Sequence, residues 1–261
     1  MSNAETTRVL LARHGQSEGN VNPSIYPKKG DSKISLTEPG WMQAYGTGQF
    51  LTPYYQEAGV TEWPMIHVST HNRTEETLGG ILKGMGDAFP GEPKLYPQPF
   101  LTEKFFGAAS ALEFADEKLS EEVIKTLKRL SKIVYANDPF QASHLFGEST
   151  KFTMMAGKMM IDTIRRDIAE GKREHLVVTH GAVIQAMLMS LMHARPQDKN
   201  KIGNPGNADV IEIIGTPKNW SITRIWDGEN GVRVNENLRD KVKRFTVADL
   251  PPLPDFLQQK P

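Results

Sequence analysis

One pattern constrains the fold of this chain more than any other: a short apolar run that ends in a His–Gly pair, present twice. Residues 9–12 (Val-Leu-Leu-Ala) lead into Arg13-His14-Gly15, and residues 176–178 (Leu-Val-Val) lead into Thr179-His180-Gly181. A run of this length bounded by polar and turn-forming residues is typical of a buried strand. We therefore expect each histidine to lie at the carboxyl end of a buried strand.

The rest of the chain alternates between further strand patterns and amphipathic patterns. Apolar residues at three- and four-residue spacing predict helices, and short apolar runs predict strands. Strands that alternate with helices imply a mostly parallel sheet with helices on both faces, so we expect an α/β three-layer sandwich. The expected helices cover residues 37–55, 70–84, 121–134, 152–168 and 182–192, and the further strands cover residues 65–69, 94–100, 210–214 and 221–226.

The N-caps of two of these helices and two methionines on a third lead to further predictions. Thr37 is the expected N-cap of the first helix, and Thr70 or Asn72 that of the second. Met155 and Met159 lie beside the apolar stripe of the helix over residues 152–168. Packing in the core is favoured for these methionines over a cofactor site.

The length of 261 residues suits one large α/β domain or two small ones. We expect one domain over residues 5–245 and a Pro-rich tail over residues 246–261. Residues 86–146 form a long segment rich in aromatic residues and proline, which predicts a cap-like insertion over the site.

Charged and nucleophilic side chains gather where such a fold places its ligand. Ligands of parallel sheets bind at the carboxyl ends of the strands, where Arg13, His14 and His180 are expected. A guanidinium binds two phosphate oxygens at once, and an imidazole with a free lone pair can act as a nucleophile. Arg73, at the start of a helix, adds a second guanidinium, and Gly15 lets backbone N–H groups approach an oxyanion. This set predicts a phosphate pocket.

Composition excludes several other classes of function. The 31 basic and 31 acidic residues balance, so we expect neither nucleic acid nor a membrane as a partner. The chain has no cysteine, which removes thiolate metal sites and thiol nucleophiles, and neither His14 nor His180 has a second histidine four positions away. We expect no metal and no cofactor. The lack of cysteine and of signal-peptide blocks favours a cytoplasmic location.

Six sequence blocks resemble, in the same order, those of the histidine phosphatase superfamily, the phosphoglycerate mutase-like proteins. They are residues 11–20 (Leu-Ala-Arg-His-Gly-Gln-Ser-Glu-Gly-Asn), residues 36–44, residues 69–77 with Arg73 and Thr77, residues 101–107 with Glu103, residues 147–149 and residues 178–181. The resemblance covers most of the chain. It implies the α/β fold expected above and a reaction through a phosphohistidine.

The resemblance also assigns roles. It implies that His14 is the phosphorylated nucleophile and that Glu103 protonates the leaving oxygen and then activates water. His180 would complete the catalytic set, and the substrate would be held by Arg13, Asn20, Arg73 and Gly181. Glu113 lies ten positions after Glu103 and is the competing choice of acid. Residues 108–110 (Ala-Ala-Ser) depart from the pattern expected beside the acid, so the shape of this loop is open.

Three functions are compatible with these residues, and a phosphatase that hydrolyses a small phosphomonoester is favoured. The alternatives are a phosphoglycerate mutase and a non-catalytic phospho-ligand-binding relative. Residues 130–147 hold Lys132 as their only lysine or arginine, which disfavours a mutase because a mutase must bind a second carboxylate-bearing substrate. Residues 181–184 resemble the phosphatase branch, whereas residues 203–207 resemble the mutase C-terminal region slightly. A homodimer is compatible with the sequence.

Overall fold

A computed structural model describes residues 6–105, 120–138, 147–216, 219–243 and 246–250. Within them the chain forms a seven-stranded sheet in the order β3-β2-β4-β1-β5-β6-β7. The strands are β1 (Thr7–Arg13), β2 (Met65–Val68), β3 (Leu95–Pro97), β4 (Glu174–Thr179), β5 (Val210–Thr216), β6 (Asn219–Asp227) and β7 (Val232–Asn237). The two predicted His–Gly strands are thus β1 and β4, and they are neighbours at the centre of the sheet.

The sheet has a parallel half and an antiparallel half. Strands β3, β2, β4 and β1 are parallel, whereas β5, β6 and β7 continue the sheet with antiparallel pairs. Parallel neighbours need a long crossover, and the links between β5, β6 and β7 are too short to supply one. The predicted α/β fold is confirmed. The antiparallel half, and β7 in particular, was not predicted.

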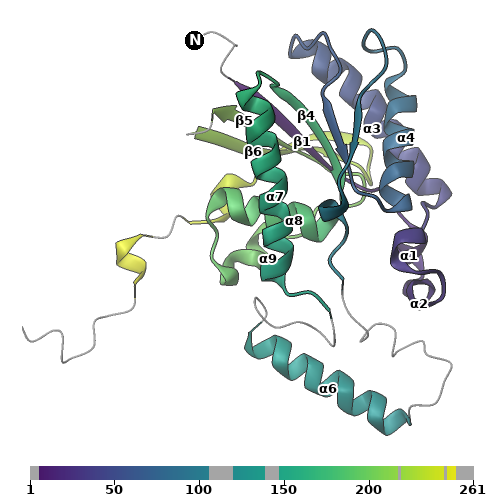
Figure 1. The fold of residues 1–261 in the computed structure, drawn as a ribbon, viewed down its shortest axis with the longest axis vertical. Coiled ribbons are helices and arrows are strands. Elements are labelled where there is room, and N and C mark those ends of the chain that lie inside the picture. The colour runs from purple at the N-terminus through teal and green to yellow at the C-terminus, as the bar shows by residue number, and fades with distance from the viewer. Residues whose placement is uncertain (1–5, 106–119, 139–146, 217–218, 244–245, 251–261) are drawn as a thin grey trace, which may run out of the picture.

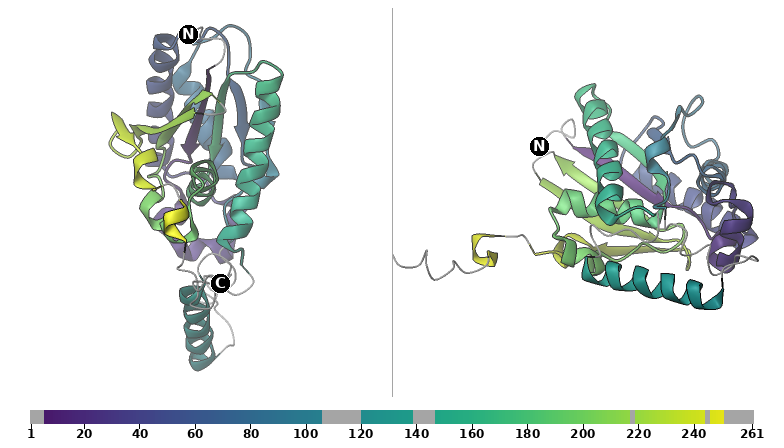
Figure 2. Two further views of the ribbon diagram at one scale, coloured as in Figure 1. Left: turned by 90° about the vertical axis from the view of Figure 1, so that its left-hand side faces the viewer. Right: turned by 60° about the horizontal axis from the view of Figure 1, so that its bottom comes forward.

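Helices cover both faces of the sheet, as Figures 1 and 2 show. Helices α3 (Glu38–Glu57) and α4 (Asn72–Met85) pack on one face, and α7 (Thr150–Ala169) and α8 (Gly181–Met192) pack on the other. Side chains alternate along β1 accordingly, because successive residues of a strand point to opposite faces. Leu10 belongs to the core under α3 and α4, and Leu11 to the core under α7 and α8. The three layers are those expected from the sequence.

The start of α3 follows the prediction, and that of α4 does not. Thr37 caps α3, since its Oγ1 accepts a hydrogen bond from the Gly40 N–H at 3.2 Å. The N-cap of α4 is His71, without a capping side-chain hydrogen bond, rather than Thr70 or Asn72. The histidine occupies this position because its ring turns toward the site described below.

The prediction that Met155 and Met159 pack in the core is wrong. Their side chains are 60% and 54% exposed, whereas Met160 is fully buried. A rotation of 100° per residue places Met155 and Met159 on one side of α7 and Met160 and Ile164 on the other, which faces the sheet. Only the second side of α7 contributes to the core.

Helix α6 (Glu121–Asn137) confirms the predicted amphipathic pattern and lies outside the two helical layers in Figures 1 and 2. Val123, Leu130, Ile133 and Val134 are exposed on it. The domain boundaries and the cap-like insertion over residues 86–146 stay predictions. The remaining short helices are α1 (Glu18–Val21), α2 (Tyr26–Lys29) and α9 (Lys199–Ile202), with 3-10 turns at Pro23–Ile25, Asp31–Lys33, Pro99–Leu101, Pro196–Asp198, Arg239–Lys241 and Val247–Asp249. Among the described helices, none has the length and apolar character that a membrane crossing requires.

Candidate active site

The two histidines of the repeated pattern meet at the carboxyl ends of β1 and β4. The two strands are in register, with Arg13 opposite Thr179, and the His14 N–H donates to the Thr179 carbonyl at 2.9 Å. The rings of His14 and His180 lie edge to face, 5.2 Å between their centroids. Parallel pairing of β1 and β4 therefore joins two residues that are 166 positions apart in the chain.

The tautomer of His14 is set by a hydrogen bond to the backbone of the next residue. Its Nδ1 lies 2.7 Å from the Gly15 carbonyl oxygen, which can only accept, so Nδ1 carries the proton and the lone pair is left on Nε2. The side chain is 2% exposed. Burial, with the charges of Arg73 and Arg13, holds the pKa of His14 well below 6.5. The imidazole is therefore neutral, with a nucleophilic nitrogen, at neutral pH.

His180 lies between a hydroxyl and a carboxyl group. Its Nε2 is 2.9 Å from Ser69 Oγ, and its Nδ1 is 4.0 Å from Glu103 Oε2. Burial is the main cause that lowers the pKa of His180 well below 6.5, with Arg73 and His14 adding to it. Nδ1 is buried and has no hydrogen-bond partner among the described residues, so it is available to a ligand.

Glu103 follows the 3-10 turn at Pro99–Leu101 and directs its carboxyl group into the site. Oε1 accepts from the Lys104 N–H at 2.9 Å. Burial raises the pKa of Glu103, although the Lys104 N–H and the two nearby arginines oppose the rise. A rise in pKa favours the protonated carboxyl group, the form that a general acid needs. The competing Glu113 and residues 108–110 lie outside the described residues.

Two guanidinium groups line the same site. Arg73, 1% exposed, donates from Nη1 to the Asp31 carbonyl at 2.7 Å and lies 2.9 Å from Asp31 Oδ1. Arg13 donates from Nη1 to the Pro205 carbonyl at 2.7 Å. The Nε atoms of both arginines are buried without a partner among the described residues. Each arginine is thus anchored at one nitrogen and offers another to an anion.

The predicted glycines serve packing as much as binding. The Gly15 N–H donates to Thr77 Oγ1 at 3.0 Å and is therefore not directed at a ligand in this structure. A Cβ on Gly15 would overlap the Gly40 carbonyl, so glycine is needed where the loop after β1 crosses the start of α3. A Cβ on Gly181 would lie 3.4 Å from Arg13 Nε, an ordinary contact, so the start of α8 lies beside that guanidinium without a steric need for glycine.

Asn20 lies at the edge of the site and is exposed. Its Oδ1 accepts from the Ser17 N–H at 2.9 Å and from Asn207 Nδ2 at 3.1 Å. Asn207 Nδ2 also donates to the His14 carbonyl at 3.3 Å, so Asn20 is joined to His14 through Asn207. The prediction placed Asn20 near the substrate; the structure shows it bonded to the loops around His14.

Two further residues that were not assigned to the site from sequence, Asp31 and His71, also lie beside it. Asp31 Oδ2 is 3.9 Å from His71 Nδ1, and the His71 ring lies 5.0 Å from that of His180. Both residues therefore line the site beside Arg73. No motif marks Asp31, because it reaches the site through the 3-10 turn at Asp31–Lys33, far from the strand ends in sequence.

The site favours an anion over a metal ion. His14, Glu103 and His180 offer ligand atoms within 4.8 Å of one another, a spacing that a metal could use. The charges of Arg13 and Arg73, however, lower the pKa values of both imidazoles, and the same field opposes a cation. A dianion would be stabilised by this field and by two guanidinium groups.

Comparison with known proteins agrees with this geometry. The family model described as histidine phosphatase superfamily (branch 1) matches residues 9–228. A phosphoglycerate mutase-like protein of Arabidopsis thaliana is 37% identical over 215 residues, which cover 79% of this chain and 74% of that protein. The 2,3-bisphosphoglycerate-dependent phosphoglycerate mutase 2 of Gloeobacter violaceus is 26% identical over 197 residues, 74% of this chain and 80% of that protein. The solved structure of a mycobacterial glucosyl-3-phosphoglycerate phosphatase has a TM-score of 0.58 at 18% identity, over 89% of this chain and 99% of that one.

Proposed function

The chain belongs to the histidine phosphatase superfamily, branch 1, and from this premise we propose that it hydrolyses a small phosphomonoester through a phosphohistidine on His14. The observation that carries the proposal is the hydrogen bond from His14 Nδ1 to the Gly15 carbonyl, 2.7 Å long. It leaves the Nε2 lone pair of a neutral, buried imidazole beside two anion-binding guanidinium groups.

In the first step, His14 Nε2 attacks phosphorus while the bond to the leaving oxygen breaks. Glu103 donates its proton to that oxygen, so the product leaves as an alcohol. Arg13 and Arg73 neutralise the charge on the equatorial phosphoryl oxygens. When Ser69 donates its hydroxyl proton to His180 Nε2, the His180 Nδ1–H faces the same pocket and donates to a phosphoryl oxygen.

In the second step, water attacks the phosphohistidine. The Glu103 carboxylate accepts a proton from the water, the N–P bond breaks, and inorganic phosphate leaves. Nε2 of His14 regains its lone pair, and Glu103 regains the proton that it gave away. The cycle is balanced without a metal ion or cofactor.

A phosphoglycerate mutase is the second candidate, because the Gloeobacter violaceus relative carries that name. A mutase must return the phosphoryl group to a second phosphoglycerate, which requires further cations near the pocket. Lys132 is the only lysine or arginine of residues 130–147, so the last part of the expected cap offers few cations, whereas residues 86–129 hold six. The third candidate is a non-catalytic phospho-ligand-binding relative. The free Nε2 of His14 favours a nucleophile over a site that only binds phosphate.

Two activity assays and one intact-mass measurement on the same protein sample separate these candidates. The first follows phosphate release from a panel of phosphomonoesters, and the second follows interconversion of 3- and 2-phosphoglycerate with a bisphosphoglycerate primer. From the parent protein we expect phosphate release with slow or no interconversion. From His14→Ala we expect neither activity. Fast interconversion with negligible phosphate release would assign the chain to the mutases, and no phosphoenzyme in an intact-mass measurement would favour the binding protein.

A further inference from the structure

A second cluster of ionisable side chains lies away from the proposed active site. His67 on β2, His175 on β4 and Asp167 on α7 direct side chains toward one another, and we call them the His67 cluster. Met65 pairs with His175 and His67 with Val177, so the two histidines sit diagonally on the face of the sheet that α7 covers. Asp167 approaches them from the last turns of α7.

The distances within the His67 cluster fit metal coordination. His67 Nε2 is 3.4 Å from Asp167 Oδ2, His175 Nδ1 is 3.9 Å from the same oxygen, and all three ligand atoms lie within 4.8 Å of one another. Two ligands at about 2.1 Å from a tetrahedral ion are about 3.4 Å apart. A small movement of His175 would complete the arrangement.

Several buried polar atoms of the His67 cluster meet no geometric hydrogen-bond partner in the described part of the chain. His67 Nε2, Asp167 Oδ2 and both nitrogens of His175 are buried without a hydrogen-bond partner there. Both imidazoles are almost completely buried. Buried polar atoms are nearly always paired, so the three that converge here, His67 Nε2, Asp167 Oδ2 and His175 Nδ1, indicate a missing ligand.

Electrostatics distinguish the His67 cluster from the proposed active site. Burial lowers the pKa of His67 to about 4, and burial with the neighbouring His67 lowers that of His175 to about 4. No arginine contributes, in contrast to the causes found at His14 and His180. Both imidazoles are thus neutral at neutral pH, the form in which histidine binds a metal. Burial raises the pKa of Asp167, and the nearby Arg166 opposes that rise.

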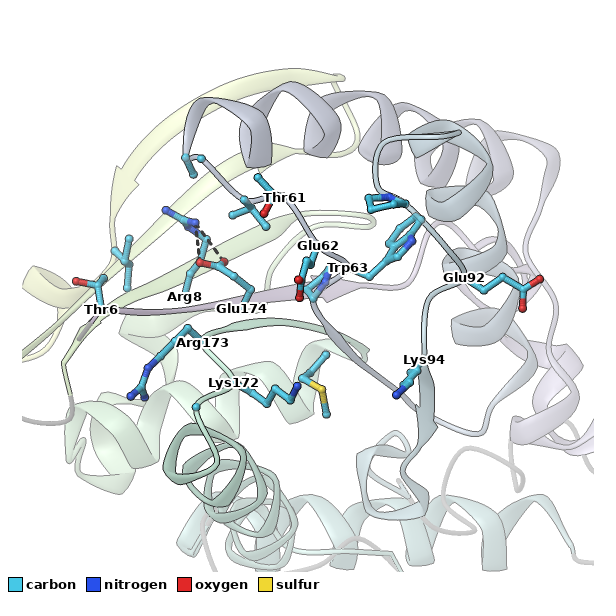
Figure 3. Close-up of a pocket in the computed structure, with 18 residues that line it drawn as sticks. Thr6, Arg8, Thr61, Glu62, Trp63, Glu92, Lys94, Lys172, Arg173 and Glu174 are labelled. Atoms are coloured by element: carbon cyan, nitrogen blue, oxygen red, sulfur yellow. Dashed lines mark hydrogen bonds and ion pairs between the residues drawn. The ribbon is translucent and has the colours of Figure 1, made fainter. Parts of the chain in front are cut away.

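The His67 cluster also has a polar neighbour for one imidazole and one partly exposed ligand. Gln98 Nε2 lies 3.3 Å from His67 Nδ1, and a flip of this amide would present its oxygen to an Nδ1–H. Metal-bound histidines usually donate their second nitrogen in this way. The Asp167 side chain is 17% exposed. A cavity of about 780 Å³ opens at the amino ends of β1, β2 and β4 (Figure 3), and Met65, Lys172 and Glu174 are among the residues that line it.

We propose that the His67 cluster binds one divalent transition-metal ion, with Zn²⁺ as the best fit to two imidazoles and one carboxylate. Water would complete the coordination. The ion would join β2, β4 and α7 at a point separate from the proposed catalytic residues, and its role would be structural. This proposal does not depend on the proposed function.

The test is a calorimetric titration of chelator-treated full-length protein with ZnCl₂. It is made in the His14→Ala background, because His14, Glu103 and His180 form the other possible metal-binding set. We expect one Zn²⁺ per chain. In the same background, Asp167→Asn and His175→Gln should each weaken binding at least about 100-fold, since even loss of an outer-shell partner costs about 10–100-fold.

Matched controls separate ligand loss from a general effect. Asp162→Asn removes an exposed carboxylate from the same helix, and His193→Asn removes an exposed histidine at a left-handed position that asparagine tolerates. Both should bind Zn²⁺ as the parent does. Absence of Zn²⁺ binding by the folded parent would overturn the proposal, whether or not the other variants fold, and so would unchanged binding in folded Asp167→Asn.

Discussion

Replacing Glu103 with glutamine tests the proposed acid with little change in geometry. The glutamine oxygen can still accept from the Lys104 N–H, which holds Glu103 Oε1 at 2.9 Å, so the variant loses the proton and keeps the position. General acid catalysis contributes about 10²–10⁴-fold, which corresponds to about 2.7–5.5 kcal/mol of transition-state stabilisation. Burial raises the pKa of Glu103, which favours the protonated form that a general acid needs.

The assay compares an alkyl phosphate with p-nitrophenyl phosphate in stopped flow. The aryl leaving group needs little protonation, so Glu103→Gln should still release p-nitrophenolate in a rapid burst of about one equivalent. Hydrolysis of the phosphohistidine, which needs Glu103 as a base, should then be slow, and phosphoenzyme should accumulate. With the alkyl phosphate, whose leaving group needs protonation, no rapid burst of alcohol release should occur. Equal slowing of the first step for both substrates would refute the acid role, and the same comparison on Glu113→Gln would show whether the other carboxylate fills it.

Three further predictions follow from the two clusters. His14→Ala should remain folded by circular dichroism and lose several orders of magnitude in turnover, and near-normal turnover would contradict the nucleophile assignment. Excess chelator should leave turnover unchanged while lowering the melting temperature; turnover that vanishes and returns with a divalent ion would place the metal in the reaction instead. The free energy of unfolding of metal-free protein should fall as the pH drops from about 6.5 to about 4, because unfolded His67 and His175 take up protons that their folded forms, with pKa values of about 4, do not. The free energy of unfolding should fall by up to about 3 kcal/mol for each histidine. Urea titrations at several pH values measure this fall, and an unchanged pH dependence in His175→Gln would contradict the prediction.

The central features of the fold and of the site could be predicted from sequence because they follow local patterns. Apolar runs that end in His–Gly fix where His14 and His180 lie on their strands, and parallel pairing then brings them together. Asp31 could not be predicted, because its position depends on how a 3-10 turn packs against Arg73. The exposed methionines of α7 show the same limit, since an apolar stripe does not reveal which side of a helix finds a partner.

The His67 cluster escaped sequence analysis for a different reason. Its members are separated by 100 and 8 positions, and neither interval matches a metal-binding spacing. His67 and His175 interrupt apolar strands and read as ordinary buried residues. Only the order of β2 and β4 in the sheet places them on neighbouring strands beneath α7.

The position of β1 in the sheet has a consequence for how the protein acquires activity. Its two neighbours are β4 and β5, which begin at Glu174 and Val210, so the strand that carries His14 leaves the ribosome long before either partner. Contacts this distant in sequence form late, because a long loop must close first. A chain in which β1 has not yet paired with β4 therefore lacks the arrangement that brings His14 beside His180. Recovery of turnover during refolding should report the insertion of β1 between β4 and β5.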